Sequence, residues 1–194
     1  MMYATVLLAD LSYGAGFALY EYSARGTAMG GATVANKAEP ASLAVNPALI
    51  TELDGTQAQL GLTVVTANAK TTVAGQQRGL KNDVWYLPNF YITQKWSDQV
   101  SVGLGGFSRY GLGGEYKNWE TWAGSQLAYK VKLETFSFTP TIAVKANDEF
   151  SVAMGLEAML IGFTQNSTLR PGPAANATAY EISGSGVSWG GNFS

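Results

Sequence analysis

The sequence predicts an all-β protein, an antiparallel transmembrane β-barrel of which this chain carries about six strands. Three observations predict this fold. From residue 56 onward, segments of about ten residues alternate apolar side chains with small or polar ones, as membrane-crossing strands do. The connections between these segments alternate between short and long. Only 13% of the 194 residues are charged, whereas 46% are hydrophobic and 23 are glycine, which is unusual for a soluble globular protein.

Residue types that the chain lacks exclude several classes of protein. The chain has no cysteine and no histidine, which excludes disulfides, thiol chemistry, His-ligated metals and Ser-His hydrolases. Ser, Asp, Glu and Lys show no spacing of a recognisable catalytic site, so we expect no enzyme, no cofactor and no metal. The net charge of -2 and the scattered lysines argue against nucleic-acid binding. No window holds the roughly 18 apolar residues of a transmembrane helix, so strands must make any crossing.

Residues 1–14, MMYATVLLADLSYG, are interpreted as a signal-peptide remnant. An apolar run from Tyr3 to Ala9 is followed by small residues, which suits cleavage before Ala15. No Lys or Arg precedes that run, although a signal peptide normally carries positive charge there. An arbitrary start of the chain is therefore the alternative.

Residues 15–55 form a second region, which is rich in Ala and Gly and poor in large side chains. Near its end stand Asn46, Pro47 and Ala48. Proline pushes the residue before it into extended backbone, and Asn can bond nearby backbone groups. This tripeptide should therefore fix the backbone where the region leads into the first strand. Considered alone, the tripeptide is better explained as a simple turn before a strand.

Residues 56–194 hold the predicted strands, and most of these have one continuous apolar face. In the first, TQAQLGLTVVT, apolar side chains occupy every second position from residue 58 to residue 64. Further strands are predicted over residues 83–94, 100–110, 134–145 and 150–163 and from residue 182 onward. Glu157 faces away from the apolar side of its strand. Pro88 and Pro140 lie inside two strands, where proline normally marks an edge or a bulge.

The connections between these strands fall into two groups. Residues 97–99 and 146–149 are short turns, whereas the long connections are residues 68–82, 111–132 and 164–183. Outer-membrane barrels have short periplasmic turns at one rim and longer external loops at the other. A soluble antiparallel sandwich also alternates and also has hairpins, so it is the alternative fold.

The second long connection carries aromatic residues at roughly helical spacing. This spacing predicts a short amphipathic helix over the mouth of the pore. Trp119 and Trp122, which lie in this helix, are candidates for contact with a hydrophobic ligand. Packing against neighbouring loops is the role that we favour for these aromatic side chains.

Several ordered motifs resemble the FadL/OmpP1/TodX family of outer-membrane transporters for long-chain fatty acids and other hydrophobic molecules. The first motif, GFALYE, begins at Gly16, and the second, NPAL, begins at Asn46. The similarity continues through LPNFYITQKWSDQVSVGLGGFSRYGLGGEY and TPTIAVKANDEFSVAMGLEAM. It covers nearly the whole chain after residue 15.

The resemblance implies a barrel of about fourteen strands in the outer membrane of a Gram-negative bacterium. Residues 15–55 would be an N-terminal hatch that fills the lumen, with Asn46, Pro47 and Ala48 as its motif. In the family, a ligand leaves sideways through a gap at a kinked third strand. The residues that carry these roles here would be Gly16, Phe17, Leu19 and Glu21 in the luminal segment and Arg109, Tyr110 and Gly111 at the kink.

The sequence therefore predicts the N-terminal portion of a channel that admits hydrophobic small molecules passively. The expected partners are a fatty acid or hydrocarbon ligand and outer-membrane lipid, and the full-length protein is expected to be a monomer. A closed transmembrane wall needs at least about eight strands, so the chain is expected to be a fragment. The alternatives are a structural or adhesive barrel and a soluble lipid-binding β-sandwich.

Overall fold

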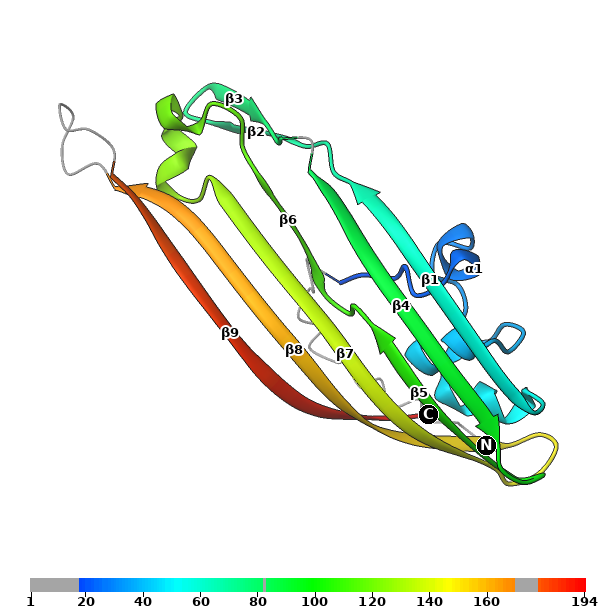
Figure 1. Cartoon of the computed structure of the whole chain (residues 1–194). Coiled ribbons are helices and arrows are strands. Elements are labelled where there is room, and N and C mark those ends of the chain that lie inside the picture. Colours follow the sequence, from blue (N-terminus) through cyan, green and yellow to red (C-terminus); the bar gives the residue numbers. More distant parts are fainter. Residues whose placement is uncertain (1–17, 82, 170–177) are drawn as a thin grey trace, which may run out of the picture.

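The computed structural model describes residues 18–81, 83–169 and 178–194. The stretch interpreted as a signal-peptide remnant, residues 1–14, lies outside the described residues, as do Gly16 and Phe17. Most of the described chain belongs to one curved antiparallel sheet, shown in Figure 1 as a tilted wall of long strands.

Six strands of this sheet follow one another in the order β1-β4-β5-β7-β8-β9, and β6 also pairs with β7. β5 and β6 lie end to end against β7, so together they form one crossing of the sheet. The prediction of about six strands is therefore confirmed. The strands are β1 (Thr56–Thr66), β4 (Val84–Lys95), β5 (Val100–Phe107), β6 (Gly111–Glu115), β7 (Lys130–Lys145), β8 (Ser151–Leu169) and β9 (Thr178–Phe193).

The alternation in the sequence separates the two faces of the sheet. Along β1, exposed and partly buried residues alternate without a break, and Leu60 on the apolar face is 84% exposed. Gln59 on the opposite face accepts a hydrogen bond from the backbone of Ala41, and Tyr91 and Thr93 of β4 are buried. The apolar face is thus open, whereas the small or polar face is buried along β4 and partly buried along β1. A soluble sandwich would cover its apolar face with a second layer, so this fold alternative is wrong.

Residues 18–55, called here the N-terminal segment, cover part of the small and polar face of the sheet (Figure 1). The helices of the segment contact β1, β4, β5, β7 and β8, whereas β9 is exposed along nearly its whole length. The segment contains α1 (Ala24–Ala28) and two 3-10 helices, η1 (Pro40–Ala44) and η2 (Pro47–Glu52). Its core side chains pack on the wall in one cluster, which includes Leu43, Ile50, Leu53, Tyr91, Phe107, Ala143 and Ala153.

Glycine in the wall lets the N-terminal segment approach closely. A Cβ atom placed on Gly103 would lie 2.8 Å from the side chain of Leu43, which is 1% exposed. A larger residue at this position would push the segment away from β5. Small residues are therefore needed on the wall as well as in the segment itself.

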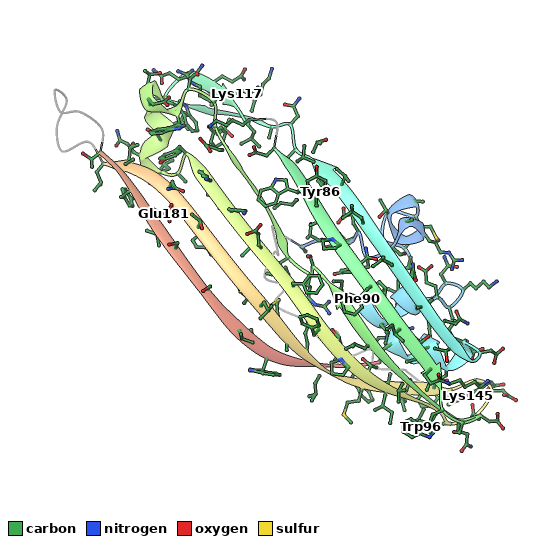
Figure 2. The ribbon with its side chains drawn as sticks, in the orientation of Figure 1. Tyr86, Phe90, Trp96, Lys117, Lys145 and Glu181 are labelled. Carbon is green, nitrogen blue, oxygen red and sulfur yellow. The ribbon has the colours of Figure 1, made fainter. Side chains whose placement is uncertain are left out.

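The connections at the two ends of the sheet differ, as the sequence predicts. Short turns join β4 to β5 and β7 to β8, and Figure 2 shows Trp96 and Lys145 at that end, with Lys117 at the other. The far end carries a hairpin of β2 (Lys70–Val73) and β3 (Gln76–Gly79) and the 3-10 helices η3 (Trp119–Thr121) and η4 (Ala123–Gln126).

The predicted limits of the second and third long connections are wrong. β6 and the first residues of β7 occupy the two ends of residues 111–132, and β8 and β9 extend well into residues 164–183. Polar pairs such as Asn166 with Glu181 continue the ladder there. Backbone pairing does not require apolar side chains, so the strands run on beyond the apolar pattern.

The described helices are all too short or too polar to cross a membrane.

Candidate functional site

The wall is broken at a kink between β5 and β6. Phe107 at the end of β5 pairs with Ser137, and Gly111 at the start of β6 pairs with Glu134. Three residues, Ser108 to Tyr110, therefore lie opposite only two residues of β7, which is the arrangement of a β-bulge. The side chain of Thr135 replaces some of the missing backbone hydrogen bonds. Its hydroxyl accepts a hydrogen bond from the Tyr110 N–H at 3.0 Å and donates one to the Tyr110 carbonyl at 2.5 Å.

Beyond this kink, β4 is paired with a strand on one side only. The β4–β5 ladder covers Phe90 to Lys95, whereas the pairs recorded for Val84–Asn89 are with β1 alone. β6 pairs with β7, and no β4 partner is recorded for it in the described chain. This stretch of wall, between β4 and β6, is called the opening below.

Two cavities lie in the opening. The larger, of about 530 Å³, is lined by residues of β4, β6 and β7, including Trp85, Tyr86 and Lys132. The smaller, of about 170 Å³, reaches the kink, where Ser108, Tyr110 and Gly111 line it. The amino group of Lys132 lies over the Trp85 ring, 5.7 Å from its centre. The opening is thus bordered by aromatic side chains and by a few charges.

The N-terminal segment is attached to the kink on the covered face. The N–H of Leu19 donates to the carbonyl of Arg109 at 3.0 Å, and Ala18 forms an antiparallel bridge with Tyr110. Leu19 is 3% exposed, and its side chain lies 3.3 Å from where a Cβ atom on Gly111 would stand. Leu19 is therefore buried against the kink on the face of the sheet that the N-terminal segment covers.

An ion pair lies beside this attachment. The guanidinium of Arg109 donates from Nε and Nη2 to the two carboxylate oxygens of Glu157, at 2.9 and 3.1 Å. Arg109 also lies over the ring of Phe107, 5.1 Å from its centre. Tyr22 of the N-terminal segment packs edge-on against the same ring, and burial raises the pKa of the Tyr22 hydroxyl, which stays neutral.

The predicted hatch motif lies at the start of η2, with Asn46 as the residue before the helix and Pro47 and Ala48 as its first two residues. The Asn46 side chain donates to the carbonyl of Val34 at 2.8 Å, Pro47 begins η2, and the N–H of Ala48 donates to the hydroxyl of Ser194 at 3.1 Å. The expectation that this tripeptide leads directly into the first strand is wrong, because η2 separates it from β1. Its place is inside the segment, where it ties two distant stretches of chain to η2.

The predicted helix in the second long connection is absent from the described chain, and two 3-10 turns stand in its place. Trp119 stacks on Tyr129 with ring centres 3.8 Å apart. Trp122 is 2% exposed, and its indole N–H donates to the Gln76 carbonyl at 3.1 Å. Both side chains are thus packed among loops, although Trp122 also lines an apolar cavity of about 460 Å³ beside β6.

Two residues at the kink were missed by the sequence reasoning, namely Thr135 and Glu157 as the partner of Arg109. The sequence did place Glu157 on the non-apolar face, and that face also receives Arg109. A charged pair on the inner face of one sheet is the signal that could have found it. Glu21, a predicted luminal residue, accepts a hydrogen bond from the N–H of Tyr20 at 2.9 Å. Among the described residues, no cluster of His, Cys, Asp or Glu could hold a metal ion.

Residues 5–187 match the sequence pattern of the family described as "Outer membrane protein transport protein (OMPP1/FadL/TodX)". The chain belongs to this family. Its members are transporters of the Gram-negative outer membrane and not enzymes, so the family resemblance, the outer-membrane location and the expectation of no enzyme are all confirmed.

Relatives and solved structures agree with this assignment. The chain is 27% identical over 164 residues to the long-chain fatty acid transport protein of Escherichia coli K12, an alignment that covers 80% of this chain. A Pseudomonas aeruginosa FadL homologue shares the fold with a TM-score of 0.67 at 20% identity over 86% of this chain. The Ralstonia pickettii toluene transporter TbuX gives 0.68 at 17% identity over 87%.

The chain is shorter than all three of these proteins. It spans 36% of the Escherichia coli relative, 45% of the Pseudomonas aeruginosa chain and 51% of the Ralstonia pickettii chain. The strands described above therefore correspond to about half of each solved structure or less.

Proposed function

We propose that the protein admits hydrophobic small molecules passively across the outer membrane, and that they leave the lumen sideways through the opening between β4 and β6. The observation that carries this proposal is the half of β4 that pairs with β1 alone beside two cavities. A wall that lacks a ladder over several residues can let an apolar chain pass between its strands. No covalent chemistry is needed for this passage.

The N-terminal segment acts as the hatch for this route. Leu19 covers the luminal side of the kink, and the Leu19 and Ala18 backbones are bonded to Arg109 and Tyr110. A ligand that moves from the lumen into the opening must displace these contacts. Release of residues 18 and 19 from the kink is therefore the gating step.

The ligand class follows from the surfaces available and from the relatives. Aromatic and aliphatic side chains border the opening and the cavity beside η4. Moving apolar surface from water to such a site is favourable by about 25 cal/mol per Å². One relative is named for long-chain fatty acids and one solved neighbour for toluene, so both a fatty acid and an aromatic hydrocarbon are candidate ligands.

A reversible cross-link tests the route. This chain has no cysteine, so Ala18→Cys and Tyr110→Cys introduce a single pair, and bridge partners lie close enough for a disulfide. In cells that express the complete gene, oxidation should reduce uptake of oleate and of toluene to the level of cells without the gene. Reduction of the disulfide should restore uptake.

The matched control places the same cross-link in the hairpin far from the kink. Thr72 and Gln77 are register partners of β2 and β3, and their Cys pair should leave uptake unchanged in both redox states. Unchanged uptake with the 18–110 cross-link formed would overturn the gating step. If loss of the gene alters uptake of neither compound, the protein is no transporter for them, and an adhesive barrel with a permanently closed hatch becomes the better explanation.

A further inference from the structure

The Arg109–Glu157 ion pair connects the kink to a strand that is not its neighbour in the sheet. Arg109 lies between β5 and β6, Glu157 lies on β8, and β7 runs between them. The pair is bidentate, and the two side chains are only 26% and 14% exposed. A bidentate carboxylate–guanidinium pair fixes both distance and direction, more firmly than a single hydrogen bond does.

The kink has few other supports. The bulge removes ladder bonds between residues 108–110 and β7, and the opening removes the neighbour on the β4 side. Besides the ion pair, the recorded contacts that hold Arg109 and Tyr110 in place are the Phe107 ring beneath the guanidinium, the hydroxyl of Thr135 and the backbone of the N-terminal segment. The last of these must be released in the gating step. The ion pair joins Arg109 to Glu157 and includes no residue of the segment, so the gating step does not require it to break.

The other end of the ion pair also lies at a break in the sheet. The β7–β8 register is recorded up to the pair Phe138–Ala158 and again from Thr141–Gly155, so Thr139 and Pro140 interrupt it opposite Leu156 and Glu157. Proline has no N–H to give to a ladder. The ion pair thus spans from one interruption of the wall to the next, across β7.

We infer that Arg109 and Glu157 are positioning residues that hold the kink in its bent form and present the Arg109 carbonyl and the Tyr110 backbone to the N-terminal segment. Without the ion pair, the bulged residues are free to move, and the docking site for Ala18 and Leu19 is lost together with the shape of the opening. This role rests on the proposed function, because it matters to the cell only if the opening conducts.

The surroundings suit a positioning role better than a ligand-binding one. Glu157 neutralises the guanidinium and takes two of its donors, so a ligand carboxylate would meet no net positive charge there. The side of Arg109 toward Phe107 is occupied by that ring, and Tyr22 packs on the same ring. Each contact restrains Arg109 in one orientation.

The test measures docking of the N-terminal segment directly. In the complete protein in outer-membrane vesicles, the rate at which the Ala18→Cys and Tyr110→Cys pair forms a disulfide under mild oxidation reports how often the segment is docked. Glu157→Gln leaves the shape of the side chain and removes its charge. The rate should fall by about threefold to tenfold, because a partly buried guanidinium loses its counter-charge.

A matched control makes the same chemical change in an exposed ion pair. Asp54→Asn removes the carboxylate that Lys95 contacts at 2.9 Å at the rim, far from the kink, and Asp54 is 90% exposed. An exposed pair contributes little, so the rate of disulfide formation should stay at the parental value. The exchange of both residues, Arg109→Glu with Glu157→Arg, should recover much of the lost rate.

The outcomes separate this inference from the proposed function. An unchanged rate in Glu157→Gln, or an equal fall in Asp54→Asn, overturns the positioning role whether or not the protein transports. If the Glu157→Gln protein is not recovered in the membrane, Arg109→Lys is the second variant to test, because it keeps the charge and loses the two-donor geometry. A lower rate of disulfide formation in Arg109→Lys supports the positioning role, and the parental rate overturns it. If the protein without these substitutions fails to take up the compounds, only the proposed function is overturned.

Discussion

The two halves of β4 carry the same alternation of side chains but have different surroundings. From Phe90 to Lys95 the strand is paired on both sides, and its inward residues Tyr91 and Thr93 are covered by the N-terminal segment. From Val84 to Asn89 it is paired with β1 and borders two cavities. The difference arises in the neighbouring crossing, where β5 pairs with both β4 and β7, whereas β6, beyond the kink, is recorded as paired with β7 and not with β4. The wall is therefore weakened by its neighbour's backbone and not by the sequence of β4.

The largest expected effect on the free energy of unfolding comes from a side chain of the N-terminal segment that packs on the fully paired part of the wall. Ile50 is 0% exposed and sits in the cluster that packs on this half of the wall. Ile50→Ala should lower the free energy of unfolding by about 2–5 kcal/mol, because it leaves a cavity in that cluster. Urea unfolding in lipid vesicles measures this. Val34→Ala, at a position that is 56% exposed in the same segment, is the control and should have little effect.

A glycine-to-valine substitution should have a smaller effect on the free energy of unfolding, and the effect should be larger beside the paired half of β4 than beside the opening. Gly103→Val places its Cβ atom 2.8 Å from the buried side chain of Leu43 and 3.3 Å from the Ile92 carbonyl, so we expect a loss of about 1–3 kcal/mol. Gly114→Val meets Leu80 at 3.0 Å, and that side chain lies beside the cavity of about 460 Å³. It can move, so the loss should be clearly smaller. Equal losses would show that the halves are packed alike.

The smallest effect is expected from removal of a tyrosine hydroxyl, and each half of β4 carries one tyrosine that can be compared. Tyr91 is 0% exposed, and its hydroxyl donates to the Tyr22 carbonyl at 2.9 Å. Tyr91→Phe leaves that carbonyl without this donor and should cost about 1 kcal/mol in the same unfolding measurement. Tyr86, in the other half, is 64% exposed, and Tyr86→Phe should be neutral. A cost for Tyr86→Phe alone would reverse the comparison.

The faces of the sheet could be predicted from the sequence because a strand has a period of two residues. Leu60, Leu62 and Val64 had to lie on one face of β1, and the inward residues of β4 had to lie together on the opposite face of the sheet. The small residues of the N-terminal segment are visible in the sequence itself, whereas its role as a hatch came from the family resemblance and stays a prediction. These features depend on local spacing or on motifs that lie together in the chain.

The continuation of the wall beyond the kink could not be predicted. Gly111, Gly113 and Gly114 carry no side chains whose alternation could mark β6 as a strand. Arg109 and Glu157 are 48 residues apart, and only the register of β7 and β8 brings them to one place. The predicted helix failed for a related reason, since contacts from Trp119 and Trp122 to other parts of the loops override the local helical spacing.

The position of the N-terminal segment in the chain has a consequence for assembly. Residues 18–55 precede in the chain the strands that they touch, and until β4, β5 and β7 arrive Leu43 and Ile50 have apolar partners only within the segment itself. A cylinder that closed first would have to be threaded by this segment afterwards through a narrow end. If the complete wall closes around this segment, as the proposed function requires, the strands have to curl around a chain that is already in place, and a mutation in the segment is expected to impair assembly before it affects any flow of ligand.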